Sequence, residues 1–129
     1  MDHLIDTNVL VLFLQDDPRL SRRLSDWIED PGRNSFISLA SLWEISIKSG
    51  LGKLRVAYAD RLDLPELLEG AGFRLMPIGW PAIRKAGSLP LHHRDPFDRL
   101  LVAEAQLRGL PILSLDSKLD AYGIERFHR

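Results

Sequence analysis

Short apolar runs alternate along the chain with longer segments in which apolar residues recur every three or four positions. The short runs predict β-strands and the periodic segments predict α-helices. We expect strands at His3–Ile5, Ser35–Ser38, Arg74–Ile78, Pro111–Leu115 and Ile124–Phe127. We expect helices at Thr7–Gln15, Leu20–Asp30, Leu39–Gly50, from about Pro65 within Leu62–Gly72, at Pro81–Gly87 and at Pro96–Gly109, with a short helical turn before the last strand. This alternation predicts an α/β fold, with a parallel sheet covered by helices on both faces.

The clearest predicted helix, Pro96–Gly109, has proline in its first turn and glycine at its end. Asp95 precedes it in the position of an N-cap. Asp98 follows in the first turn, where a carboxylate also favours the helix dipole. The apolar residues at Leu101, Val102 and Ala105 nevertheless place Asp98 toward the core-facing side of the helix. A role beyond starting the helix is therefore indicated for Asp98.

Three further acids stand where a parallel sheet could bring them to Asp98. Asp6 and Asp116 directly follow predicted strands, and Glu44 lies among apolar residues of a predicted helix. In open α/β sheets ligands bind beyond the carboxyl ends of the strands. We therefore expect Asp6, Glu44, Asp98 and Asp116 to meet at one edge of the sheet.

Each acid also has a simpler explanation. Asp6 and Asp116 would each cap the helical segment that follows, and Glu44 would pair with Lys48 four residues later. Four carboxylates gathered at a half-buried site would instead repel one another and lose solvation unless a cation compensates them. Mg²⁺ or Mn²⁺ fits an all-oxygen ligand set. Zinc is less favoured, because the chain has no Cys and His92 and His93 are adjacent in sequence.

The bulk properties fit a single domain over residues 1–129. The chain has no linker, repeat or low-complexity tract, and its formal net charge of -1 argues against a uniformly basic nucleic-acid binder. A local basic rim around an acidic site remains compatible with that charge. The N-terminal apolar run Val9–Leu14 is too short for a signal sequence or a membrane span. We expect a cytoplasmic protein without a membrane partner.

Three segments in this order resemble PIN-domain ribonucleases, specifically the VapC-type toxins of bacterial toxin–antitoxin pairs: "HLIDTNVLVLFL", "SLWEISIKSGLGKL" and "LPLHHRDPFDRLLVAEAQLRGLPILSLD". The resemblance extends from His3 to Asp120. It implies a PIN-like three-layer α/β/α fold with a central parallel five-stranded sheet. By this resemblance Asp6, Glu44 and Asp98 match the first three catalytic, metal-binding acids, and Asp116 matches a more variable fourth. Thr7 and Asn8 match supporting positions after the first acid, and Asp95 belongs to a subgroup pattern.

The implied activity is Mg²⁺- or Mn²⁺-dependent endoribonuclease cleavage of RNA, by a homodimer that a cognate antitoxin blocks. The residues that could contact RNA are Arg94, Arg99, Lys48 and Lys53, for which a solvated surface charge is the alternative. His92 and His93 could also contact RNA or transfer a proton, although loop histidines are more often polar filler. The alternatives are an RNA-processing PIN nuclease without a toxin role and a catalytically silent RNA-binding protein of this fold.

Two other phosphate-handling classes fit less well. A haloacid-dehalogenase-type phosphatase would need an acid two residues after Asp6, where the chain has Asn8. A phosphorylated receiver domain would need an acid at the end of a central strand, and "RLMPIGW" has none. For the antitoxin, the helix carrying Leu20, Leu24, Trp27 and Ile28 is a candidate docking surface through a partly exposed Trp27. The alternative is core packing, which we favour for Leu24 and Ile28.

Overall fold

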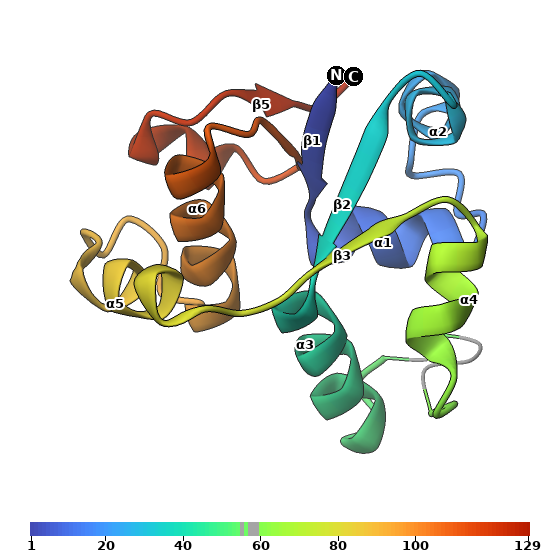
Figure 1. The fold of residues 1–129 in the computed structure, drawn as a ribbon, viewed down its shortest axis with the longest axis horizontal. Helices are drawn as coiled ribbons and strands as arrows, with labels where there is room; N and C mark the ends of the chain where they lie inside the picture. The colour runs from blue at the N-terminus through green and yellow to red at the C-terminus, as the bar shows by residue number, and fades with distance from the viewer. Residues whose placement is uncertain (55, 57–59) are drawn as a thin grey trace.

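A five-stranded sheet forms the centre of the computed structural model, which describes residues 1–54, 56 and 60–129 (Figure 1). All neighbouring strands pair in parallel, in the order β3-β2-β1-β4-β5. The strands are β1 (Asp2–Ile5), β2 (Asn34–Ser38), β3 (Arg74–Met76), β4 (Ile112–Leu113) and β5 (Arg126–Phe127). The predicted parallel sheet is therefore confirmed.

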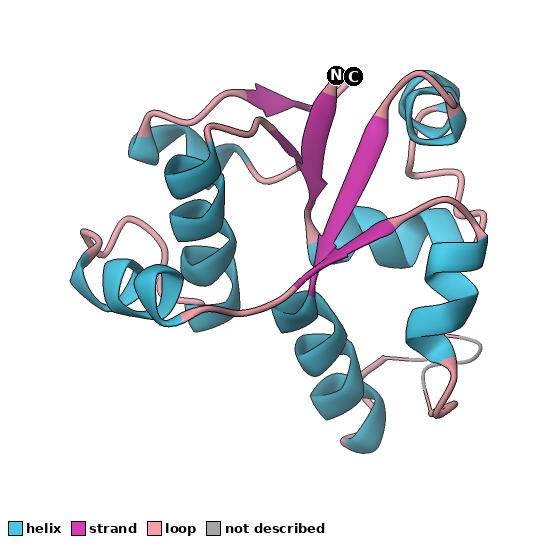
Figure 2. Cartoon of the chain, in the orientation of Figure 1, coloured by secondary structure: helices cyan, strands magenta, loops and turns pink. Residues whose placement is uncertain are grey.

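Helices cover both faces of this sheet (Figure 2). They are α1 (Thr7–Leu14), α2 (Arg22–Glu29), α3 (Leu39–Gly50), α4 (Leu64–Gly70), α5 (Trp80–Ser88) and α6 (Pro96–Arg108), with the 3-10 helix η1 at Ser117–Tyr122. Helices α1, α2 and α4 pack on one face, and α6 and η1 pack on the other, with α5 against α6. Helix α3 continues from the carboxyl end of β2 and contacts both α1 and α6. The expected three-layer α/β/α architecture is confirmed.

The two faces of the sheet bury alternate residues of the same strands. Leu4 and Ile112 face the α6 side, whereas Ile5 and Leu113 face the α1 side, and all four side chains are fully buried. Successive side chains of a strand point to opposite faces, so a strand covered on both sides is apolar throughout. This two-sided burial explains why the predicted strands are continuous apolar runs rather than alternating ones.

The connectivity reverses direction at β1. From β1 the chain adds β2 and then β3 on one side, and later returns to place β4 on the other side. Such a reversal leaves a crevice beyond the carboxyl ends of the two strands that flank it. Asp6 follows β1 and Asp116 follows β4 by three positions, so the reversal places both acids beside that crevice.

Several predicted boundaries are wrong by a few residues. Helix α2 begins at Arg22 and not at Leu20, because the Ser21 hydroxyl caps it by accepting from the Leu24 amide. The last three strands are shorter than the apolar runs that predicted them, because pairing stops where the neighbouring strand ends. Among the helices of the described residues, none combines the length and apolarity needed to cross a membrane.

The predicted docking surface on α2 is largely covered by the chain itself. Leu20, Leu24 and Ile28 are buried in the core. The Trp27 ring is partly buried, lies under the Arg33 guanidinium at 3.4 Å from the ring centroid and packs on Phe127. The core packing favoured for Leu24 and Ile28 is therefore confirmed, and the Trp27 ring already has partners in Arg33 and Phe127.

Candidate metal centre

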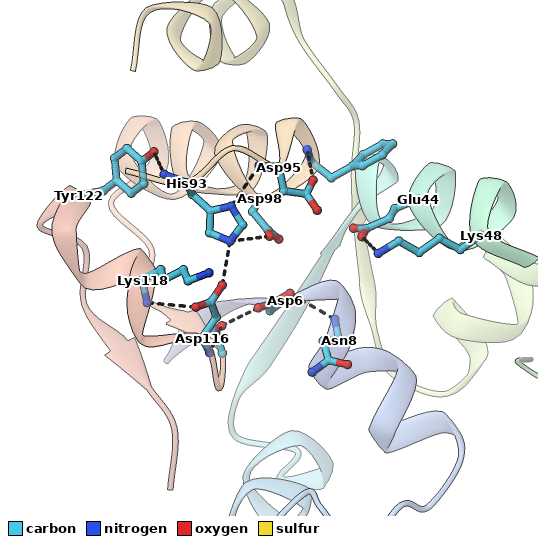
Figure 3. A network of polar contacts seen from close by, with 12 residues as sticks. Asp6, Asn8, Glu44, Lys48, His93, Asp95, Asp98, Asp116, Lys118 and Tyr122 are labelled. Carbon is cyan, nitrogen blue, oxygen red and sulfur yellow. Dashed lines mark hydrogen bonds and ion pairs between the residues drawn. The ribbon is translucent and has the colours of Figure 1, made fainter. Parts of the chain in front are cut away.

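A hollow of about 410 Å³ lies beyond the carboxyl ends of β1 and β4, and five acids line it, among them the four named from the sequence. We call it the acidic hollow, lined by Asp6, Thr7, Asn8, Val11, Glu44, Lys48, Leu54, Asp95, Asp98, Leu115 and Asp116. Figure 3 shows Asp98 and Asp116 beside the His93 ring, with Asp6 next to them and Glu44 pointing in from α3. The structure therefore brings together the four acids named from the sequence.

Asp6 is 5% exposed and is held by donors from two segments. One carboxylate oxygen accepts from the Asn8 amide at 3.2 Å, which makes Asp6 the N-cap of α1, and the other accepts from the Ser114 hydroxyl. Burial raises the pKa of the Asp6 carboxyl, while these hydrogen bonds oppose the rise and the charges of Glu44 and Asp116 add to it. Asp6 thus caps the helix and faces the other acids at the same time.

Glu44 is 4% exposed, and its two carboxylate oxygens have different surroundings. Oε2 accepts from the Lys48 ammonium, the pair expected for a helix surface. Oε1 is buried without a hydrogen-bond partner among the described residues. An unpartnered buried carboxylate oxygen is costly, which indicates that a further group binds there.

Asp98 points inward from the first turn of α6, and its side chain is 17% exposed. Burial raises the pKa of its carboxyl to about 7, and the charges of Asp6, Asp95 and Glu44 add to the rise while His93 opposes it. The cap of α6 is Asp95, whose Oδ1 accepts from the Phe97 amide at 2.9 Å. Asp98 is therefore not needed as the cap.

Asp116 is the most exposed of the four acids, with 34% of its side chain accessible. Its Oδ1 accepts from the Lys118 amide at 3.0 Å and so caps η1, as the simpler explanation for this acid expected. Its Oδ2 lies 2.8 Å from Nε2 of His93. Its amide donates to the Ser114 hydroxyl at 3.0 Å.

Two residues of this network were not singled out from the sequence as part of the site. Ser114 is fully buried and joins Asp6 to Asp116 through its hydroxyl. Its position inside an apolar strand, two residues before an acid, is the signal that could have identified it. His93 touches two acids and is not polar filler; only its place just before the Asp95 cap hinted at this.

The remaining predicted residues divide between the acidic hollow and its surroundings. Thr7 lines the hollow and donates to Ser41 at 2.8 Å. Arg94 and Lys53 are exposed. The Arg99 guanidinium donates to the carbonyl oxygens of Ala86 and Leu89, at 2.8 and 3.1 Å, and thereby holds the end of α5.

The donor set fits a hard divalent cation. The four acids supply only carboxylate oxygens, and one of these is the unpartnered Oε1 of Glu44. The raised pKa values of Asp6 and Asp98 reflect burial and like charge, which a bound cation would relieve. In the described part of the chain, a compact set of possible ligand atoms within 4.8 Å of one another belongs to His93, Asp98 and Asp116.

Comparisons with known proteins agree with this fold. Residues 3–125 match the PIN domain family. VapBC2 from Rickettsia felis, solved with a DNA fragment from its promoter, is 14% identical with a TM-score of 0.71, covering 98% of both chains. FitAcB from Neisseria gonorrhoeae is 20% identical with a TM-score of 0.68, covering 99% of this chain and 97% of that one. A toxin–antitoxin complex from Klebsiella pneumoniae is 18% identical with a TM-score of 0.62, covering 92% and 90%. Among curated proteins nothing matches the chain.

Proposed function

The chain belongs to the PIN domain family, a class of nucleases, and from this premise we propose that it is a Mg²⁺- or Mn²⁺-dependent endoribonuclease. The observation that carries the proposal is the buried Glu44 carboxylate, whose Oε1 has no partner among the described residues. Glu44 lines the same hollow as Asp6, Asp98 and Asp116. A purely structural cluster would leave this buried oxygen without a hydrogen-bond partner, although Lys48 pairs with the other oxygen of the carboxylate.

The proposed reaction is hydrolysis of an RNA phosphodiester bond. A divalent cation, when bound, lowers the pKa of a coordinated water and neutralises charge on the phosphate. Asp6, Glu44, Asp98 and Asp116 would hold that cation. Asp6 is fixed in place by Ser114 and Asn8, so its oxygens need little reorganisation on binding. Lys48, at the rim of the acidic hollow, supplies a positive charge that a phosphate could contact.

We further propose that the protein acts as a toxin in the cytoplasm. It would form a homodimer, and a cognate antitoxin would bind and block it. The support for this role is the similarity of the chain to VapC-type toxins and the fold that it shares with the Klebsiella pneumoniae toxin–antitoxin complex. Such a protein would have to be masked in the cell that makes it. Binding of a basic antitoxin side chain near the acidic hollow would mask it directly.

The nuclease proposal is tested with purified protein, an RNA and a DNA of the same sequence, and EDTA. We expect cleavage of the RNA with Mg²⁺ or Mn²⁺, loss of cleavage in EDTA and recovery on adding the metal back. Asp6→Asn should remove cleavage while the circular dichroism spectrum stays that of the wild type. Cleavage that continues in EDTA would contradict the metal requirement, and cleavage of the DNA alone would contradict the ribonuclease assignment.

The toxin role is tested separately in cells. Expression of the wild-type chain should arrest growth, Asp6→Asn at the same protein level should not, and co-expression of the neighbouring gene should restore growth. Normal growth with abundant protein that is active in the test tube would favour an RNA-processing nuclease. An absence of any cleavage, with folded protein and metal present, would favour the catalytically silent alternative.

A further inference from the structure

The His93 ring is fixed by contacts on both of its nitrogen atoms (Figure 3). Its Nδ1 lies 3.1 Å from the Asp95 amide nitrogen, and its Nε2 lies 2.8 Å from Asp116 and 3.1 Å from Asp98. The His93 amide donates to the Tyr122 hydroxyl at 3.0 Å, and that hydroxyl donates to the Pro90 carbonyl at 2.6 Å. The ring is therefore tied to the start of α6 and to η1.

These contacts decide which ring nitrogen carries the proton. A backbone amide can only donate, so Nδ1 must accept from Asp95 with its lone pair. In a neutral imidazole with Nδ1 as the acceptor, the proton is on Nε2. That assignment agrees with the other end of the ring, where the neighbours of Nε2 are carboxylate oxygens, which accept.

We propose that His93 is a positioning residue of the nuclease site, whose Nε2–H holds Asp116 beside Asp98, and that it is not a metal ligand. This inference rests on the proposed function, because Asp98 and Asp116 would be held in position to bind a divalent cation. Its structural part, the tautomer and the hydrogen bond to Asp116, stands independently of cleavage.

Asp116 needs such a partner more than the other acids do. Its side chain is 34% exposed, against 5% for that of Glu44. Apart from the Lys118 amide on Oδ1, the described contact that restrains the carboxylate is the one from His93 to Oδ2. Without it, the carboxylate would be free to rotate toward water. Because Nε2 also lies 3.1 Å from Asp98, its N–H offsets part of the repulsion between Asp98 and Asp116.

The competing interpretation makes His93 a ligand together with Asp98 and Asp116, because the three residues form a compact set. Ligation through Nε2 would require its lone pair, and a neutral ring would then carry the proton on Nδ1, opposite the Asp95 amide. Two donors would then face each other. A nitrogen ligand would also shift metal preference toward zinc, cobalt or nickel, whereas an all-oxygen set favours Mg²⁺ and Mn²⁺.

Ring ¹⁵N NMR of the full chain, metal-free and then titrated with Mg²⁺, tests the tautomer. His93→Gln identifies the signals of this ring. We expect the Nε2–H tautomer without metal and its persistence with saturating Mg²⁺. An Nδ1–H tautomer without metal, or loss of the Nε2 proton on adding Mg²⁺, would overturn the proposal.

Two substitutions test the positioning role through Mn²⁺ affinity, measured by calorimetry. His93→Leu removes the donor at similar size, and His93→Gln keeps an N–H near the place of Nε2. Loss of a partner that orients a metal ligand typically weakens metal affinity 10–100-fold. We therefore expect His93→Leu to bind Mn²⁺ about tenfold more weakly than the wild type. His93→Gln should bind Mn²⁺ within about threefold of the wild-type affinity. His92→Leu is the matched control, because His92 is exposed and packs on Tyr122, and it should bind Mn²⁺ like the wild type.

These measurements test the role of His93 independently of the proposed nuclease function. If Gln binds as weakly as Leu, or if Leu binds like the wild type, the positioning role is overturned even when the wild type cleaves RNA. If the wild type cleaves no RNA, the nuclease proposal fails, while the ring spectrum and the order of Mn²⁺ affinities still decide what His93 does.

Discussion

For Glu44, a surface ion pair and a metal site predict different burial of the carboxylate and different effects of substitution. Its contact with Lys48 exists, and an exposed pair of this spacing is worth roughly 0.2–0.5 kcal/mol. That pair satisfies one oxygen of a buried side chain and leaves the other without a partner among the described residues. The ion pair therefore accounts for Lys48 better than it accounts for the burial of Glu44.

We predict that Glu44→Gln folds normally but binds Mn²⁺ at least about tenfold more weakly, because the amide lacks the charge that a hard cation prefers. Lys48→Ala should bind Mn²⁺ as tightly as the wild type or more tightly, since it removes a competing cation. Calorimetric titration of Mn²⁺ into the two variants checks this. Wild-type affinity in Glu44→Gln would exclude Glu44 from the metal centre and leave its burial unexplained.

Asp98 should make the metal-free protein less stable as the pH rises. Its folded-state pKa of about 7 lies above the ordinary value of 3.8, so its contribution to stability is complete below pH 4 and is lost as the pH rises to about 7. Asp98→Asn cannot ionise and escapes that loss. We expect this variant to be more stable than the wild type in EDTA at pH 7.5, by an amount on the order of 2–4 kcal/mol, with little difference at pH 4.

Urea unfolding at the two pH values measures the effect of Asp98→Asn. Saturating Mg²⁺ should narrow the difference at pH 7.5, because the cation stabilises the ionised wild type and binds the variant more weakly. A variant that is less stable than the wild type at pH 7.5 in EDTA would instead assign Asp98 a structural role in α6.

Among the elements, α6 shows how one helix start combines two tasks in neighbouring residues. Asp95 caps the helix through its side chain, and its amide fixes the His93 ring. Asp98, one turn on, is thereby free to face the acidic hollow. Arg99 points away from that hollow to the end of α5, so the same turn also anchors the neighbouring helix.

We predict that Asp95→Ala destabilises the metal-free protein by about 1 kcal/mol, the usual cost of losing an N-cap acceptor. Asp95→Asn keeps an acceptor oxygen at the same place and removes a charge that raises the pKa of Asp98. It should match or exceed the wild-type stability in urea unfolding. If Asn costs as much as Ala, then the charge of Asp95, and not its cap, stabilises the fold.

The sequence predicted the helices better than the ends of the strands. Helix α3 has the predicted bounds, and α6 ends one residue before Gly109, whose φ of 64° suits a helix terminus and favours glycine. These signals are local, since caps and glycines act within a few residues. Strand ends depend on the neighbour with which they pair, and Pro111–Leu115 therefore contains only the two-residue strand β4.

At the scale of the whole molecule, the meeting of the acids was predictable and the strand order was not. Parallel strands end at one edge of a sheet, so residues such as Asp6 and Asp116 are brought together whatever the order. The order itself follows from long-range pairing, as between β1 and β4. The contacts of His93 with Tyr122 and Asp116 join residues that are distant in the sequence, so no local pattern encodes them.

The pairing of β4 with β1 also determines when during translation the acidic hollow can form. Ser114 and Asp6 touch, although 108 positions separate them in the chain. At 5–20 residues per second, a ribosome needs roughly 5–20 s to pass from one to the other. Throughout that time the nascent chain lacks β4, Ser114 and Asp116. The acidic hollow therefore cannot be completed until synthesis is nearly finished, and a chain that terminates before Ser114 lacks one of the four acids named from the sequence.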